Sequence, residues 1–364
     1  MHGSPDAIAA VSQRLESFVL DRVEEASDIG AAGRPLLDAA ASALQGGKRL
    51  RASFCYWGWR CVADAAGART DLPADIVAAA SALEIFHAAA LVHDDIIDNS
   101  DTRRGRPAAH RALEAQHIAA GWAGEPAAYG RSAAILLGDL LVAWSDDLFE
   151  DGVADIDPHH ARTARARYAQ MRRDVTLGQY LDIAAEVSAR TVSDDEQLDR
   201  ALMVASYKSA RYSVQQPLLI GAALAGADAT QDAALRDFGH PLGMAFQLRD
   251  DVLGVFGDAQ VTGKPAGDDL REGKRTALIA LARQALPAPA RRTLDELLGD
   301  PALDDAQIGM LQGAIRDSGA LDEVERHIST YAREADRALA GAPLGNAAVG
   351  ALRDLADAAV RRQS

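Results

Sequence analysis

Two acidic stretches stand inside otherwise apolar, helix-forming segments of the chain. The first contains Asp94, Asp95 and Asp98, and the second begins with Asp250 and Asp251. Residues three and four apart are neighbours on a helix, so these like charges disfavour folding, by roughly a few tenths of a kcal/mol per pair, unless a cation lies beside them. Oxygen ligands without a His or Cys cage favour Mg²⁺, which keeps waters and completes its shell with substrate phosphates. The two stretches therefore predict a site that handles a diphosphate.

Basic residues also cluster in several places. Three cations follow a flexible glycine pair in the segment 46–51, and Arg103 and Arg104 follow the first acidic stretch. Later in the chain come Lys208, Lys264, Lys274 and Arg275. A single cluster of this kind is usually a solvated face or a charge that interacts with a helix end. Together with the acidic stretches, the clusters predict a pocket for an anionic ligand.

Composition limits the fold and the partners. The chain has 364 residues, and no Gly/Ser/Pro-rich linker or charge run divides it, so we expect one domain over residues 1–364. Aromatic residues make up only 5% of the chain and β-branched runs are scarce, which favours an all-α fold, a single large helical bundle. The net charge of −15 argues against a nucleic-acid surface.

The cysteines and the apolar runs indicate the compartment. Only Cys55 and Cys61 occur, and both fall in one predicted helix, which suits reduced core thiols in a cytosolic protein. The first residues lack the charged-then-apolar pattern of a signal peptide, and no apolar run reaches the roughly 18 residues needed to span a bilayer. We therefore expect a cytoplasmic protein with no integral membrane segment.

Turn and helix signals divide the chain into many helices. The two that carry the acidic stretches, 74–100 and 231–256, hold them near their carboxyl ends, so antiparallel packing would bring both stretches to one mouth of a central cavity. We expect the segment 104–107 to end the first of these helices, and a loop between Gly121 and Gly130. The other helices are expected near 6–27, 34–45, 49–66, 128–150, 158–189, 194–209, 211–226, 275–286, 289–299, 304–318, 320–340 and 346–362.

Seven motifs follow one another in an order that is specific when taken as a set. They are GGKRLR (46–51), HDDIID (93–98) with RRGRP (103–107), GDLL (138–141), GQYLD (178–182), YKSA (207–210), FQLRDDVLGVFGD (246–258) and GKPAGDDLREGKRT (263–276). With them the chain resembles the trans-isoprenyl diphosphate synthases, the polyprenyl synthetase family, and is most similar to its geranylgeranyl diphosphate synthases. The resemblance is dense over about residues 34–280 and implies the isoprenoid synthase type I fold, with its central cavity.

The resemblance also implies a metal site. Asp94 and Asp98 would hold two Mg²⁺ ions, with Asp95 in support. Asp250 would hold a third ion, with Asp251 and Asp258 nearby.

Two diphosphate pockets follow from the same resemblance. The residues that match the allylic diphosphate pocket are Arg103, Lys208, Gln247, Lys264 and Lys274, with Gln179 and Asp182 in the polar wall. Those that match the isopentenyl diphosphate pocket are Lys48, Arg51, His87, Arg104 and Phe246. A lone His on an apolar helix is often a satisfied core residue, but His87 lies seven residues before Asp94, two turns along the same face.

The implied reaction joins isopentenyl diphosphate to an allylic diphosphate (dimethylallyl, geranyl or farnesyl) in trans and releases pyrophosphate. The allylic C–O bond ionises, the double bond of isopentenyl diphosphate attacks the cation, and a proton is then lost. The catalytic residues would be Asp94, Asp95, Asp98, Lys208, Gln247 and Asp250. The family resemblance further implies a homodimer.

The helix before the first acidic motif bears on product length. Ala90 and Ala89 stand four and five residues before Asp94, where farnesyl-making members of the family carry bulky aromatics. The first bulky residue on that face is Phe86, one turn of about 5.4 Å deeper, close to the length of one isoprene unit. We therefore expect geranylgeranyl diphosphate (C20) as the product. If Phe86 does not close the pocket, Leu83 is the next residue that could, and the product would then be C25 or longer. The alternative is that Phe86 faces a neighbouring helix.

Other functions share part of this pattern. A farnesyl diphosphate synthase would differ only in product length. A class I terpene cyclase would also use Mg²⁺ and an acidic motif, but Lys48, Arg51 and Arg104 would then have nothing to bind. A non-catalytic partner subunit would tolerate the loss of metal ligands, whereas every expected carboxylate is present here.

Overall fold

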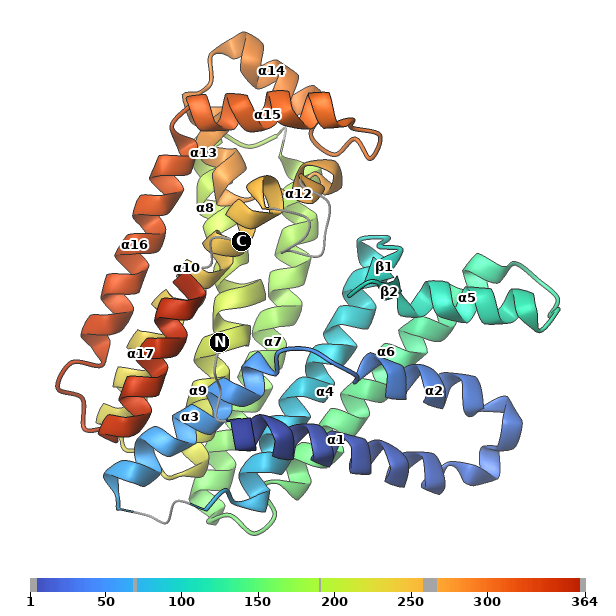
Figure 1. The fold of residues 1–364 in the computed structure, drawn as a ribbon, viewed down its shortest axis with the longest axis vertical. Helices are drawn as coiled ribbons and strands as arrows, with labels where there is room; N and C mark the ends of the chain where they lie inside the picture. The colour runs from blue at the N-terminus through green and yellow to red at the C-terminus, as the bar shows by residue number, and fades with distance from the viewer. Residues whose placement is uncertain (1–4, 68–70, 190, 258–266, 361–364) are drawn as a thin grey trace. The chain divides into compact units, whose positions relative to one another are not determined.

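The computed structural model describes residues 5–67, 71–189, 191–257 and 267–360, and most of them are helical (Figure 1), which confirms the all-α prediction. The chain divides into two compact units. Within these described residues, the N-terminal unit consists of 5–56 and 71–161, and the C-terminal unit of 57–67, 162–189, 191–257 and 267–360. Two helices, α3 (Leu50–Ala65) and α7 (Pro158–Ser188), contribute residues to both units.

The N-terminal unit is built on the helix α4 (Ala74–Ile97), which is buried over most of its length. It packs against α1 (Pro5–Glu25), α5 (Ala109–Ala119) and α6 (Pro126–Asp151). Two glycines permit its close approach to α6: a Cβ on Gly138 would lie 2.2 Å from the ring of His93, and one on Gly152 would lie 2.7 Å from the backbone nitrogen of Ala79. The remaining helices of this unit are η1 (Ser27–Ala32) and α2 (Arg34–Ala43).

The helix α4 is as long and as apolar as a helix that spans a membrane. By length and composition alone it is the one helix in the described part of the chain that could cross a membrane. Within the protein, however, 72% of its most apolar window is buried, as in the core helix of a globular protein. Polar residues also interrupt it, since the buried Glu84 accepts a hydrogen bond of 3.0 Å from the backbone N–H of Ala52.

The segment after α4 differs from the prediction. The helix ends at Ile97 with Asp98 as its C-cap, and Thr102–Arg103 (β1) pairs with Arg106–Pro107 (β2) in an antiparallel hairpin. Arg104 and Gly105 between them have φ of 53° and 73°, as a tight two-residue hairpin turn requires. The expectation that 104–107 directly ends the helix was therefore wrong.

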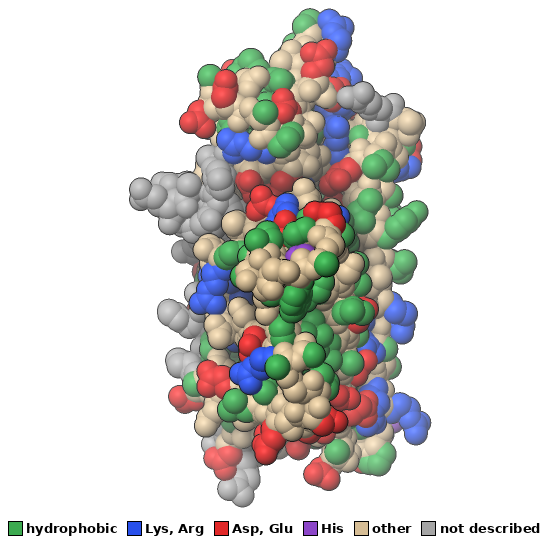
Figure 2. Space-filling view, turned by 90° about the vertical axis from the view of Figure 1, so that its right-hand side faces the viewer, with side chains coloured by type: hydrophobic (Ala, Val, Ile, Leu, Met, Phe, Trp, Pro, Cys, Tyr) green, Lys and Arg blue, Asp and Glu red, His purple; other side chains and the backbone are tan. Residues whose placement is uncertain are grey.

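The helix α5 was also not predicted, and the expected loop between Gly121 and Gly130 is shorter, because α6 already begins at Pro126. Three rings pack where α5 meets α6: the centroid of His117 lies 5.9 Å from that of Trp122 and 5.1 Å from that of Tyr129. Figure 2 views the side on which this end of α5 lies in Figure 1, and hydrophobic side chains gather there. Exposed large apolar residues of α5 and α6 are Ile118, Ile135 and Leu136.

The C-terminal unit is organised around the long helix α10 (Ala229–Phe256). A capping box begins it: the side chain of Asp228 accepts from the backbone N–H of Gln231, whose side chain accepts from the N–H of Asp228. The helix packs against η2, α9, α12, α16 and α17. The helices of this unit after α7 are α8 (Asp194–Val204), η2 (Ala205–Gln215), α9 (Gln216–Leu224), α10, α12 (Asp268–Glu272), α13 (Ala277–Ala285), α14 (Ala288–Leu297), α15 (Asp305–Asp317), α16 (Ala320–Ala338) and α17 (Asn346–Val360).

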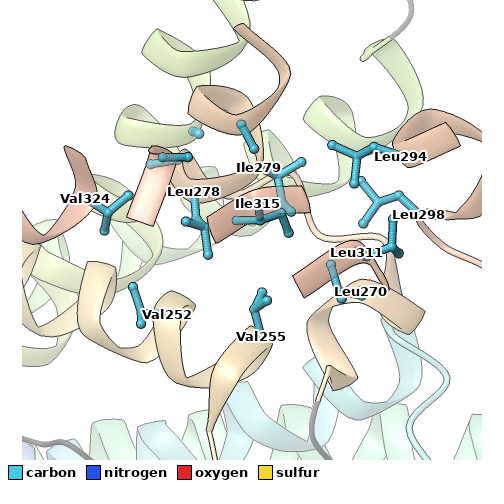
Figure 3. Close-up of a cluster of buried hydrophobic side chains, with 14 of the residues drawn as sticks. Val252, Val255, Leu270, Leu278, Ile279, Leu294, Leu298, Leu311, Ile315 and Val324 are labelled. Carbon is cyan, nitrogen blue, oxygen red and sulfur yellow. The ribbon is translucent and has the colours of Figure 1, made fainter. Parts of the chain in front are cut away.

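A hydrophobic cluster joins the end of α10 to the helices that follow it. Figure 3 shows Val252 and Val255 of α10 in one cluster with Leu270 of α12, Leu278 of α13 and Ile315 of α15. Leu270, Leu278 and Ile315 are fully buried. The cluster therefore fixes the backbone on which the second acidic motif stands.

Two further expectations can be compared with the structure. A helix break near residue 210 was wrong, because η2, a π-helix, continues directly from α8 into α9. Cys55 and Cys61 are buried free thiols, as predicted, and burial raises the pKa of each to about 12.

Candidate functional site

The first acidic motif lies at the carboxyl end of α4, and the hairpin holds an arginine against it. Asp95 is buried, and its Oδ1 accepts a 2.8 Å hydrogen bond from Nε of Arg103 and a second from Nη2. Nη2 of Arg103 also lies 3.8 Å from Oδ2 of Asp94. Burial raises the pKa of Asp95 although Arg103 opposes it. Asp94 and Asp98 are half-buried, so Asp95 is the member of the motif that anchors the hairpin.

The glycine pair of the 46–51 segment makes room for Arg104. Gly46 and Gly47 have φ of 69° and 90°, which favours glycine. A Cβ on Gly47 would lie 2.9 Å from Nη2 of Arg104, and Nη1 of Arg104 donates a 3.1 Å hydrogen bond to the carbonyl of Gln45. The glycines therefore let this loop lie directly against the Arg104 guanidinium.

His87 shares its surroundings with these basic residues. Burial lowers its pKa well below the usual range, and the charges of Arg51, Arg104, Arg103 and Arg49 lower it further. The imidazole is therefore neutral at neutral pH. The structure thus brings three predicted members of the isopentenyl diphosphate pocket, Arg51, His87 and Arg104, into one basic environment inside the N-terminal unit.

The other two residues predicted for the isopentenyl diphosphate pocket lie on other segments of the chain. Lys48 is exposed in the loop before α3. Phe246 is half-buried on α10 in the C-terminal unit. The chain-length candidates lie on α4, where Phe86 and Ala89 are buried and Ala90 is half-buried.

The second acidic motif lies near the end of α10. Asp250 is half-buried, whereas Asp251 is buried and its Oδ1 accepts a 2.7 Å hydrogen bond from Nε2 of Gln247. Burial raises the pKa of Asp251 to about 8, and the neighbouring carboxylates of Asp269 and Asp250 contribute. Like charges are therefore concentrated here, and a bound cation would relieve their repulsion.

Lys208 lies on the π-helix η2 and is held by an aspartate of α7. Its Nζ is 2.5 Å from Oδ2 of Asp182. A Cβ on Gly178, one turn before Asp182, would lie 2.3 Å from the backbone nitrogen of Lys208. The two helices therefore touch at this glycine, and π-helical turns of this kind are frequent at functional sites. Gln179 is half-buried beside the contact.

The last basic motif lies partly in the described chain. Nζ of Lys274 is 2.6 Å from Oε2 of Glu272 and 3.4 Å from Oδ1 of Asp269. Lys264 and Asp258 lie outside the described residues.

The ligands predicted for the metal suit Mg²⁺ better than a metal that proteins bind through His and Cys side chains. The predicted ligands Asp94, Asp98 and Asp250 are carboxylates, without His or Cys among them. Over residues 5–67, 71–189, 191–257 and 267–360, no three His, Cys, Asp or Glu side chains converge as a ready-made metal cage. Open carboxylates suit an ion that takes its remaining ligands from water and substrate phosphates.

Sequence reasoning missed two features of the site. Glu84 lies 3.8 Å from Nη1 of Arg49 and ties α4 to the start of α3, and its signal was a lone acid in an apolar helix. The hairpin that carries Arg103 had only Gly105 as a turn signal, because Arg104 stands where such turns favour Asn, Asp or Gly.

Comparisons with known proteins identify the family of the chain. The model of the polyprenyl synthetase family matches residues 34–313. A solved geranylgeranyl pyrophosphate synthase from Corynebacterium glutamicum, complexed with isoprenyl diphosphate and magnesium, is 36% identical with a TM-score of 0.92, and the match covers 100% of both chains.

Two curated relatives are similar over shorter spans. A short chain isoprenyl diphosphate synthase of Methanocaldococcus jannaschii is 32% identical over 234 residues, 64% of this chain and 64% of that protein. A geranylfarnesyl diphosphate synthase of Aeropyrum pernix is 31% identical over 300 residues, 82% of this chain and 84% of that protein. These matches confirm the resemblance carried by the motifs: the chain belongs to the polyprenyl synthetase family.

Proposed function

We propose that this protein is a trans-prenyltransferase that condenses isopentenyl diphosphate with an allylic diphosphate and releases pyrophosphate. The observation that carries the proposal is the basic environment of His87, Arg51 and Arg104 in the same unit as the first acidic motif. A synthase needs a second diphosphate pocket beside its metal site. A class I cyclase, which ionises one substrate, has no use for it.

The isopentenyl diphosphate pocket works mainly through charge. Arg51, Arg104 and Lys48 supply cations for a diphosphate, and arginine forks suit phosphate oxygens. A neutral His87 donates a hydrogen bond to that diphosphate without adding a charge that the arginines would repel. Phe246 is proposed to contact the isoprenoid part of this substrate.

The allylic diphosphate is proposed to bind between the acidic motifs and the remaining cations. Asp94, Asp98 and Asp250 would hold Mg²⁺, about three ions per site. When bound, Mg²⁺ neutralises the charge that develops on the diphosphate as the allylic C–O bond breaks. Arg103 approaches from the hairpin, where it already pairs with Asp95.

Further residues, all from the C-terminal unit, are proposed to bind the allylic diphosphate. We assign Lys208, Gln247, Lys264 and Lys274 to the diphosphate, with Gln179 in the polar wall. In the structure Lys208 is paired with Asp182, so diphosphate binding would exchange one anionic partner for another. The apolar pocket beyond would exclude water that quenches the cation.

The proposed product is geranylgeranyl diphosphate (C20). The small side chains of Ala89 and Ala90 support this length because they would not close a pocket near the first motif, and the buried Phe86 stands one turn, about 5.4 Å, further from the motif along α4. A geranylgeranyl synthase is among the similar structures. A C25 or longer product is the alternative, because the A. pernix relative is a geranylfarnesyl diphosphate synthase.

We further propose that residues 1–364 act as one catalytic domain, in a cytoplasmic homodimer. The exposed apolar side chains of α5 and α6 support a protein–protein contact, since a contiguous exposed apolar patch marks such a contact.

The test is product analysis. The purified protein is incubated with Mg²⁺, isopentenyl diphosphate and each allylic primer in turn, and the dephosphorylated products are separated by chromatography. Elongation to C20 supports the proposal. A cyclic hydrocarbon would identify a cyclase, and no product with any primer would indicate a non-catalytic subunit; either result rejects the proposal.

A further inference from the structure

The second acidic motif lacks a carboxylate that the first one has. In the first motif, Asp94 is followed four residues later by Asp98, whereas Asp250 is followed four residues later by Gly254. Positions four apart lie on one face of a helix. The second motif therefore has an uncharged, side-chain-free position where the first has its third acid.

The carboxylate of Asp269 fills the space that a side chain at position 254 would need. A Cβ on Gly254 would lie 2.0 Å from Oδ2, 2.3 Å from Cγ and 2.8 Å from Oδ1 of Asp269. The Oδ1 of Asp269 also lies 3.4 Å from Nζ of Lys274. A carboxylate from a different helix thus stands among the motif residues.

The backbone that carries Asp269 is firmly placed. The short helix α12 is bounded by Gly267 and Gly273, both in the left-handed region with φ of 73° and 77°. Leu270, the next residue after Asp269, is fully buried in the cluster that contains Val255 of α10 (Figure 3). Its carbonyl accepts a 2.9 Å hydrogen bond from the N–H of Gly299.

The end of α10 is fixed from the same side. Nε2 of Gln312 on α15 donates a 2.6 Å hydrogen bond to the carbonyl of Val255, one residue after Gly254. Each partner of the Gly254–Asp269 contact therefore has a fully buried chain neighbour, Val255 and Leu270 respectively. The contact belongs to the fold and does not depend on a surface side chain.

We propose that Asp269 supplies, from α12, the negative charge that the second acidic motif lacks at Gly254. Asp269 is then a positioning residue for the cation held at Asp250 and for Lys274, and Gly254 is required because any side chain there displaces it. The role assigned to Asp269 is exerted through its charge on that cation and on Lys274. The inference rests on the proposed metal site.

The test moves the carboxylate from one helix to the other. Mn²⁺ is titrated into the full-length protein with inorganic pyrophosphate present, and free Mn²⁺ is followed by electron paramagnetic resonance. Asp269→Asn and Asp269→Ala are expected to weaken Mn²⁺ binding about 10–100-fold, the usual effect of losing an outer partner of a metal ligand. Asp269→Ala removes the three atoms nearest to a Cβ at position 254, so the double variant Gly254→Asp/Asp269→Ala is expected to restore most of the affinity.

Controls separate this role from a structural one. Asp268→Ala removes the same charge one residue away and is expected to bind Mn²⁺ as the wild type does. Gly254→Ala adds only a methyl group, yet it is expected to copy the Asp269→Asn defect, because the methyl group displaces the carboxylate. If Asp269→Ala fails to fold, the Mn²⁺ affinity of Asp269→Asn is the test, because Asn keeps the size and shape of the Asp side chain and removes only its charge.

Two results would overturn the inference: unchanged Mn²⁺ affinity in Asp269→Asn, or no gain when Asp is placed at position 254 in the Asp269→Ala background. Neither result would contradict the proposed function, provided that the wild-type protein still elongates its substrates. Failure of the wild type to bind Mn²⁺ or to elongate would instead reject the proposed function.

Discussion

The contact between Gly178 of α7 and the backbone of η2 gives the prediction whose size follows most directly from the structure. In Gly178→Ala the new Cβ would lie 2.3 Å from the backbone nitrogen and 2.6 Å from the Cα of Lys208. Ordinary contact begins near 3.4 Å, and backbone atoms cannot rotate away. The two helices must therefore separate by about 1 Å, which moves Lys208 relative to Asp182.

A displacement of this size affects both rate and stability. A misplacement of about 1 Å at a positioning group costs about 100-fold in rate, so we expect kcat to fall by about that factor. Overpacking costs about 1–3 kcal/mol, and the better helix propensity of Ala offsets about 1 kcal/mol. The KM for isopentenyl diphosphate should change little, since its proposed charged contacts, Arg51 and Arg104, belong to the other unit.

Steady-state kinetics and calorimetry measure these effects, with Gly309→Ala as the matched control. Gly309 lies inside α15, and a Cβ there would meet no atom within 4 Å, so the same substitution is expected to keep kcat and to raise the stability by up to about 1 kcal/mol. A Gly178→Ala enzyme with wild-type kcat would show that the contact does not position Lys208.

Other predictions concern the acidic motifs, His87 and the pocket floor. Asp94→Ala and Asp250→Ala should each lose orders of magnitude in turnover while keeping the thermal transition, because they remove like charge from the apo protein; near-normal rates in either would reject the metal assignment. Burial and the neighbouring arginines keep His87 neutral in the folded state, whereas the unfolded chain protonates it below its ordinary pKa of 6.5. The unfolded state then binds more protons, so stability falls on acidification below that pH, by at most about 1.4 kcal/mol per pH unit for this group, and His87→Gln should flatten the denaturation-versus-pH curve. Phe86→Ala should lengthen the main product beyond that of the wild type on chromatography; an unchanged product would place the pocket floor elsewhere.

Local chemistry made much of the fold and site predictable. Apolar periodicity located the long helices α4 and α10, and the acidic residues on them stood out because folding alone gives no reason to place like charges there. The basic clusters were equally visible, since the types of residue were informative without their partners. The pairing of Arg103 with Asp95 was not predicted, because it depends on a hairpin whose strands have two residues each, too short for an alternating pattern.

The structural features that were not predicted depend on contacts between segments that are distant in the sequence. The helix α5 is short and carries mixed polarity, so its stability comes from packing on α6 and not from its own pattern. The π-helix η2 gives no periodic signal in the sequence, and only the close approach of Gly178 to Lys208 reveals what it positions. The contact of Asp269 with Gly254 joins residues of two helices through a missing side chain, which only the three-dimensional structure displays.

We propose that both acidic motifs bind metal ions on one diphosphate. This proposal is tested most directly by a crystal structure of the protein with Mn²⁺ and a non-hydrolysable allylic diphosphate, in which anomalous scattering locates the ions. We predict ions at Asp94 and Asp98 and at Asp250 that share the oxygens of a single diphosphate. Ions at only one motif, or a diphosphate bound without either, would contradict the account.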